Sequence, residues 1–378
     1  MWLSPEDQVD LSELEGRNFT CTDGCGLCCL CQPELLPNEE KLFRSKFPEM
    51  VVLKNEPHRH YAMAMKKGMG SCAFLNDRRC KVYNERPHFC REFPFHIHVG
   101  MRAQVQLDLS CRGAWVNDGE DAKAVGAKMA EDAKTAIMHT LYDSKRVYRE
   151  FFDNCHENGI DPDPEPIQAL VRERIEKMTY LPYLAAVLEG SAEDEEQIDL
   201  KKLRVPNELD KSAMKELESA ALEGANESLG APNAFDAPVY CDEANRWNVF
   251  LSEHGRFEQY VIKDSGDLDH IRTVDPNAVR LLVPDESGRK VLADYIRVLN
   301  NRDSIVGSAY YLVDEYEYED YFPNVYTGVL STSILDLLWR ASLIAHVKGT
   351  KLDAVGVREG IIYYDMDRLD GPSIGAFI

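Results

Sequence analysis

Apolar and polar residues alternate along one stretch of the chain, residues 93–109. The apolar positions are Phe93, Phe95, Ile97, Val99, Val105, Leu107 and Leu109. A period of two is typical of strands that bury one face, so this stretch predicts a pair of β-strands. Gly100-Met101-Arg102 is expected to form the turn between them.

The pattern changes to a helical one after residue 117. Residues 121–143, 144–157 and 166–188 place apolar side chains three and four positions apart, which predicts helices. Residues 189–238 are polar and acidic, with Gly, Asn and Pro, and are expected to form a partly helical linker.

The last part of the chain mixes both patterns. Residues 238–241, 247–252 and 257–263 predict a three-strand meander, and residues 334–348 a buried helix that begins near a Ser333 cap and stops at Gly349. A last short strand is expected at residues 360–365.

These elements predict an α+β protein with three regions. Residues 1–117 are expected to form an irregular cysteine-rich metal-binding domain, and residues 118–237 a helical region with an acidic linker. Residues 238–378 are expected to form an α+β domain with a small antiparallel sheet. The 378 residues, 44% of them apolar, are enough for two or three domains.

Charge is distributed unevenly along the chain. The formal net charge is −22, yet residues 41–112 hold 14 Lys and Arg against 6 Asp and Glu, so this region has a local charge of +8. The excess of cations indicates a solvated surface, or compensation for a thiolate-bound metal centre. A docking face for an acidic partner or for nucleic acid is the least favoured interpretation, because few aromatic residues accompany the cations.

The sequence does not predict a membrane protein. No apolar run approaches the roughly 18–20 residues of a membrane span, and the acidic first residues lack the pattern of a signal peptide. We therefore expect a cytoplasmic protein without a membrane span.

Nine of the eleven cysteines fall within the first 111 residues. The tightest group is Cys21-Thr-Asp-Gly-Cys25-Gly-Leu-Cys28-Cys29-Leu-Cys31, whose spacings let several thiolates converge on one centre. Adjacent residues such as Cys28 and Cys29 are expected to point apart and to serve two different sites. Disulfides are disfavoured in a reducing cytosol, and ordinary buried thiols seldom cluster so densely.

The spacing of these cysteines carries a family resemblance. A Cys-x-x-x-Cys-Gly-x-Cys-Cys start at Cys21–Cys29 is followed by Cys-x-Phe-Leu and then by Arg-Pro-x-x-Cys-Arg-x-Phe-Pro within Cys72–Pro94. Together these motifs resemble the YkgJ-type cysteine-cluster family of zinc- or iron-chelating proteins. The resemblance covers only about residues 20–113.

The resemblance implies a set of eight metal ligands: Cys21, Cys25, Cys28, Cys29, Cys72, Cys80, Cys90 and Cys111. Eight thiolates suit two four-ligand sites, or one cluster plus a second metal. Iron–sulfur, as one or two 4Fe–4S clusters, is the first expectation because its usual ligands are thiolates. Zinc is the alternative, since structural zinc sites use the same ligands.

Other residues near these cysteines are expected to support the site or to replace one ligand. Arg86 and Arg91 are expected to assist cofactor binding without touching metal, through hydrogen bonds to sulfur or by anchoring the chain; surface salt bridges are the alternative. The alternative ligand in place of one of the eight thiolates is Cys31, His88, His96 or His98. Alternating histidines, however, are more typical of a solvated strand face. Cys155 and Cys241 have no thiol near them in sequence and are interpreted as ordinary residues.

Three classes of function are compatible with this pattern. The first is a redox or electron-transfer protein, or a cluster-dependent accessory that acts with a protein partner or a larger complex. The second is a zinc-stapled adaptor. The third is a cluster-dependent enzyme distantly related to the flagellin lysine methylase type. The sequence has no P-loop and no His-Glu-x-x-His motif, so no catalytic residue is assigned.

Overall fold

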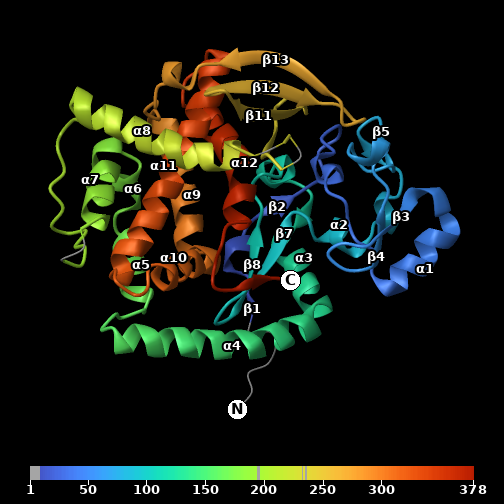
Figure 1. Cartoon of the computed structure of the whole chain (residues 1–378), viewed down its shortest axis with the longest axis horizontal. Coiled ribbons are helices and arrows are strands. Elements are labelled where there is room, and N and C mark those ends of the chain that lie inside the picture. Colours follow the sequence, from blue (N-terminus) through green and yellow to red (C-terminus); the bar gives the residue numbers. More distant parts are fainter. Residues whose placement is uncertain (1–8, 194–195, 232, 235) are drawn as a thin grey trace.

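A small central sheet joins the two ends of the chain. The computed structural model describes residues 9–193, 196–231, 233–234 and 236–378. In the central sheet, β1 (Val9–Asp10) runs parallel to β8 (Ala103–Leu107), which pairs antiparallel with β7 (Phe95–Val99), and β7 pairs in turn with β14 (Ala376–Phe377) (Figure 1). The β7–β8 hairpin confirms the strand pair expected from alternation in residues 93–109.

The cysteine-rich lobe contains only short elements, as expected. It comprises helices α1 (Pro37–Lys46) and α2 (His88–Glu92) and two small hairpins. The hairpins are β3 (Val51–Lys54) with β4 (His60–Met63), and β5 (Leu75–Asn76) with β6 (Arg79–Cys80). A further two-residue pair, β2 (Asn18–Phe19) with β9 (Glu120–Asp121), connects the lobe to the helical region. Figure 1 shows this lobe on the opposite side of the central sheet from most of the helices.

The middle region is helical, as expected, but the helices have other bounds: the stretch 121–143 is interrupted at Ala133, and the stretch 166–188 forms three helices. Its helices are α3 (Ala122–Asp132), α4 (Lys134–Glu157), α5 (Glu165–Arg172), α6 (Ile175–Met178), α7 (Leu181–Ser191) and α8 (Lys211–Leu229). The break expected between residues 143 and 144 is absent, because α4 continues through it on one amphipathic face. The linker was expected to be partly helical, and the 19-residue α8, which packs against α11 (Phe322–Lys348), confirms this.

Four helices dominate the C-terminal region: α9 (Glu286–Asn301), α10 (Asp303–Glu315), α11 (Phe322–Lys348) and α12 (Ala354–Leu369). The strand expected at residues 360–365 is wrong, because these residues form the middle of α12. Their side chains are buried on nearly every side, which hides the helical period. Gly349 ends α11 with φ of 67°, as expected, but the helix begins at Phe322 and Ser333 lies inside it.

Helix α11 is long and apolar enough to cross a membrane by length and composition, and it alone meets that test among the described residues. The rest of the chain buries 83% of its apolar window, as in the core helix of a folded protein.

The expected meander is confirmed and extended by one strand. β10 (Val239–Cys241), β11 (Trp247–Glu253), β12 (Arg256–Ile262) and β13 (Leu268–Val274) pair in this order, all antiparallel. One face of β11 and β12 packs on the helices, where Phe257 lies 5.4 Å from Trp339 between ring centroids. The observed architecture is therefore α+β. The three domain boundaries stay a prediction. One continuous core includes residues from all three regions.

A buried charge network connects the first residues to the C-terminal helices. The Arg302 side chain is 0% exposed and lies between Glu13 (2.9 Å) and Asp365 (2.7 Å). It also donates to the carbonyl oxygen of Leu107 in β8 (2.9 Å), and Asp365 accepts from the Leu109 amide (2.7 Å). Because each charge is paired away from water, removal of one would leave another uncompensated.

Replacement of Arg302 by Met should therefore lower the free energy of unfolding by about 3–5 kcal/mol. Arg297→Met, in α9, is the matched control, because its ion pairs with Glu176 and Asp294 are exposed and should contribute only about 0–1 kcal/mol. Urea denaturation followed by circular dichroism measures both variants. Equal losses in the two would contradict the role given to Arg302.

Candidate metal centre

The first group of cysteines lies on a tight loop that the local sequence shapes. Gly26 adopts φ of 62°, in the left-handed region that favours glycine. The chain then forms a single 3₁₀ turn, Leu27–Leu30, in which the Cys29 amide donates to the Gly26 carbonyl (3.0 Å). A side chain at Gly26 would also approach Leu75 and Trp247 to within 3.2–3.3 Å. The loop therefore presents its thiols at fixed positions against neighbouring elements.

The other cysteines reach this loop from four different segments. The Cys72 amide donates to the Cys29 carbonyl (2.7 Å), which holds the Cys72 segment beside the loop. The β5–β6 hairpin places Cys80 opposite Leu75, and α2 carries Cys90. Cys111 follows β8 and precedes a 3₁₀ turn. The fold thus brings together cysteines that are far apart in the sequence.

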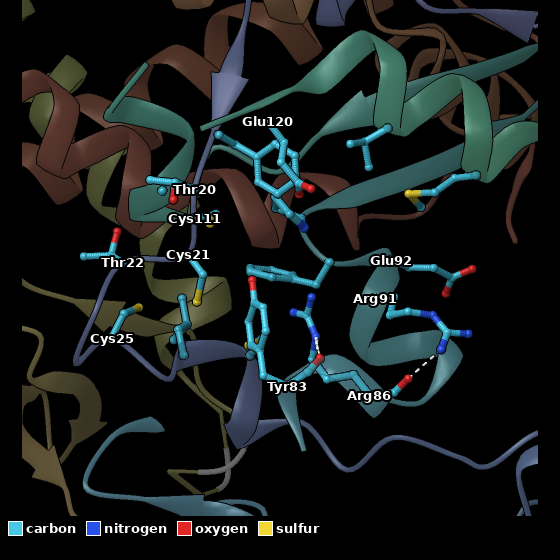
Figure 2. A pocket seen from close by; sticks show the side chains of 18 of the residues that line it. Thr20, Cys21, Thr22, Cys25, Tyr83, Arg86, Arg91, Glu92, Cys111 and Glu120 are labelled. Carbon is cyan, nitrogen blue, oxygen red and sulfur yellow. Dashed lines mark hydrogen bonds between the residues drawn. The ribbon is translucent and has the colours of Figure 1, made fainter. Parts of the chain in front are cut away.

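Two adjoining cavities collect these thiols. The first cavity, about 590 Å³, is lined by the four cysteines Cys21, Cys25, Cys28 and Cys111. The second cavity, about 410 Å³, is lined by seven: Cys21, Cys28, Cys29, Cys31, Cys72, Cys80 and Cys90. Figure 2 shows the first cavity, with Cys21, Cys25 and Cys111 on one side and Arg91 with Glu92 on the other. All eight cysteines expected as ligands line at least one cavity; their assignment as ligands stays a prediction. The expectation that Cys28 and Cys29 point apart is wrong, because both line the second cavity and their thiols are hydrogen-bonded to each other.

Burial and mutual repulsion keep most of these thiols protonated in the metal-free chain. Burial, with contributions from Cys72 and other thiols, raises the pKa of Cys90 to about 12. Burial is also the main cause that raises the pKa values of Cys72 and Cys80. Cysteine binds metal as the thiolate, so a bound cation would displace the protons of these thiols and compensate the negative charge that results. The donor set and the two cavities therefore fit a thiolate-bound metal.

Arg86 provides positive charge between the two cavities and lines both. Its charge opposes the rise in pKa of Cys21, Cys80 and Cys90. The guanidinium itself donates to the Tyr83 carbonyl (2.9 Å) and stacks on the Tyr83 ring, 3.8 Å from the centroid. Arg86 thus stabilises negative charge on sulfur through the field of its cation.

Arg91 anchors the chain around Cys90. It donates to the Arg86 carbonyl (2.6 Å), as Figure 2 shows, and pairs with Glu39 of α1 (3.4 Å). These contacts fit the expected anchoring role, and the exposed pair with Glu39 also fits the alternative of a surface salt bridge, so a role for Arg91 in cofactor binding stays a prediction.

The histidines considered as substitute ligands lie at the margin of the cysteines or away from them. His88 lines the first cavity but pairs with Glu92 (2.7 Å). His96 lies 3.7 Å from the Asp108 carboxylate and lines a further cavity together with Cys28, Cys31 and Cys90. His98 is 0% exposed, so the interpretation of a solvated strand face is wrong for it: β14 covers the edge of β7 at this position.

The contact of Cys241 with the cysteines of the loop was not expected from the sequence. Cys241, at the end of β10, is 0% exposed, and its Sγ lies 3.6 Å from the Sγ of Cys25. The hydrogen bond between these thiols lowers the pKa of Cys25 to about 7. No local motif marks Cys241, because its partner thiol is 216 residues away. Cys155 fits the ordinary role expected of it, since it is buried in α4 within the main core.

Comparison with known proteins identifies the cysteine-rich segment. Residues 20–112 match a family model, CxxCxxCC, described as a zinc- or iron-chelating domain. No curated protein and no solved structure matches the chain. The matched segment contains all eight cysteines expected as ligands, and Cys241 lies outside it. Over residues 20–112, the chain therefore carries the metal-binding domain of the CxxCxxCC cysteine-cluster family.

Proposed function

We propose that this protein is an iron–sulfur protein that transfers electrons to or from a protein partner. The second cavity holds a 4Fe–4S cluster, and the first cavity holds a second metal centre. The observation that carries this proposal is the number and spacing of the thiols around the second cavity.

Pairs of sulfurs lie close together, but no three of those described lie close enough to surround one ion without a rearrangement. Two thiolates on one tetrahedral zinc, with Zn–S near 2.3 Å, lie about 3.8 Å apart. Within the described part of the chain, only Glu34, His58 and His60 form a group of three or more candidate ligand atoms all within 4.8 Å of one another. No three cysteines do so. A cubane binds each thiolate to a different iron, and its ligands are therefore more widely spaced.

The electrostatic surroundings also favour a cluster. A 4Fe–4S centre with four thiolates carries net negative charge in both common oxidation states, and nearby cations stabilise it. Arg86 lines both cavities, and the surrounding region carries a local charge of +8.

Electron transfer requires a short path between the cluster and a partner's surface. Cys21 and Cys31, which line the second cavity, are exposed, and so is the neighbouring Tyr83 at 43%. A partner that docks on this side would come close to the cluster without a change in the fold.

The second candidate is a zinc-stapled adaptor, and one observation favours it. The 3.6 Å between the sulfurs of Cys25 and Cys241 matches two ligands of a single tetrahedral ion. Zinc in the first cavity alone is compatible with a cluster in the second; zinc in both would exclude electron transfer.

Anaerobic purification of the full chain, followed by iron, sulfide and zinc analysis, tests the proposal. We expect about four irons with matching sulfide, and a broad absorption near roughly 400 nm that bleaches with dithionite. In Cys90→Ser, the iron content should fall at least about tenfold, because one ligand of the cluster is lost.

Cys155→Ser is the matched control, because Cys155 is also a buried thiol but lies in α4, away from the cavities. It should keep the wild-type iron content. A colourless wild-type protein with one or two zincs would contradict the iron–sulfur proposal and leave the adaptor.

The charge of Arg86 should also affect the cluster. In Arg86→Gln, the reduction potential should move to a more negative value, since a cation that stabilises the more negative reduced state is removed. Arg44→Gln is the control, because Arg44 is an exposed cation of the same lobe that pairs with Glu40. Redox titration followed by visible absorption measures both. An unchanged or more positive potential in Arg86→Gln would contradict this role.

A further inference from the structure

We propose that Cys241 is a metal ligand that shares one ion with Cys25, so that the metal centre of the first cavity joins the cysteine-rich lobe to the C-terminal sheet. The inference rests on the proposed metal-binding function and deepens it. Cys241 lies outside the matched family domain, residues 20–112.

The first argument is the geometry of the two thiols. Their Sγ atoms lie 3.6 Å apart, close to the roughly 3.8 Å edge of a tetrahedral site with metal–sulfur distances near 2.3 Å. The distance is much longer than the 2.05 Å of a disulfide bond. Cys25 also lines the first cavity with Cys21, Cys28 and Cys111. Among the described residues no third sulfur lies within 4.8 Å of both Cys25 and Cys241, so one of these thiols would have to move closer to complete the site.

The second argument is that the surrounding structure fixes both residues. The Trp247 indole N–H donates to the Cys25 carbonyl (2.9 Å), and Arg112 donates to the Cys241 carbonyl (2.6 Å). Trp247 pairs directly with Cys241 across β10 and β11. A ligand pair whose backbone is held on both sides is preorganised for a cation.

Arg112 extends this support to the C-terminal helices. Its guanidinium forms a buried ion pair with Glu359 of α12 (2.7 Å), and Glu359 also accepts a hydrogen bond from Tyr240. Arg112 directly follows Cys111, another thiol of the first cavity. The elements that hold Cys111 and Cys241 are thus connected through one charge pair.

The third argument is a small separate core that the loop and the sheet share. Leu27 of the loop packs with Trp247, Val249 and Ile262 of the sheet, and Cys25, Cys29 and Cys241 contact the same group. Arg78 stacks on Trp247, 3.3 Å from the ring centroid, and reaches the Cys25 carbonyl. A metal bound by Cys25 and Cys241 would therefore stabilise this contact between two parts of the chain.

The test is an anaerobic cobalt(II) titration of the reduced, metal-free full chain. Thiolate-to-cobalt charge-transfer absorption reports sulfur ligands directly. In Cys241→Ser, one cobalt ion should bind at least about tenfold more weakly and lose part of this absorption, as should occur in Cys25→Ser. Cys155→Ser, another buried thiol outside the family domain, should match the wild type.

Hydrogen exchange provides a second readout that does not depend on the spectrum. Cobalt should slow exchange of the amides of β10 and β11 in the wild type and in Cys155→Ser but not in Cys241→Ser. Circular dichroism of the metal-free variants verifies the fold, and Cys241→Ala repeats the test without a hydroxyl group.

Each adverse outcome has a distinct meaning. Wild-type cobalt affinity, absorption and exchange in Cys241→Ser would overturn the inference while leaving metal binding intact. A Cys25–Cys241 disulfide, detected by mass spectrometry in freshly and anaerobically purified protein, would also overturn it. A wild-type chain that binds neither iron, zinc nor cobalt would instead overturn the proposed function.

Discussion

The thiols of this protein come from separate parts of the chain and must be held together in a small volume. Cys25 and Cys241 are 216 residues apart and yet lie in contact. Closing such long loops costs conformational entropy, and several thiolates in one place repel one another. Three features of the structure offset these costs and form a rigid frame for the thiols. They are the turn at Gly26, hydrogen bonds to the backbone carbonyls of Cys29 and Cys25, and packing on Trp247. A bound cation would remove the repulsion that remains.

Two buried ion pairs connect this frame across the molecule. Arg302 joins Glu13, near the start of the described chain, to Asp365 of α12. Arg112 joins the segment after Cys111 to Glu359, on the same helix. Helix α12 therefore holds, through Asp365 and Glu359, the chain on both sides of Cys111: Asp365 accepts from the Leu109 amide, and Glu359 pairs with Arg112.

Local sequence patterns predicted those strands in which apolar and polar residues alternate. The β7–β8 hairpin was expected for this reason, although both of its faces are buried: the polar positions Gln104 and Gln106 are enclosed and hydrogen-bonded to each other. The β10–β12 meander was also expected. Residues 360–365 were misassigned because α12 is buried nearly all round, so periodicity carries no signal there. The fourth strand, β13, has mostly exposed side chains and no apolar alternation to mark it.

The candidate site, like the fold, was predicted only in part. The eight cysteines of residues 20–112 were found because their spacing is characteristic and lies within one segment. Cys241 was not found, because only tertiary structure brings it to Cys25. Sequence spacing also could not divide the thiols into groups, whereas the two cavities do so: Cys25 and Cys111 line only the first, and Cys72, Cys80 and Cys90 only the second.

The central claim is that thiolates from these groups bind metal and that one centre is an iron–sulfur cluster. X-ray absorption spectroscopy of the anaerobically purified full chain, at the iron and zinc edges, tests it most directly. The account predicts iron surrounded by sulfur with a second iron in its next shell, and any zinc surrounded by sulfur alone. Iron or zinc bound mainly by oxygen or nitrogen, or a chain that retains no metal, would contradict it.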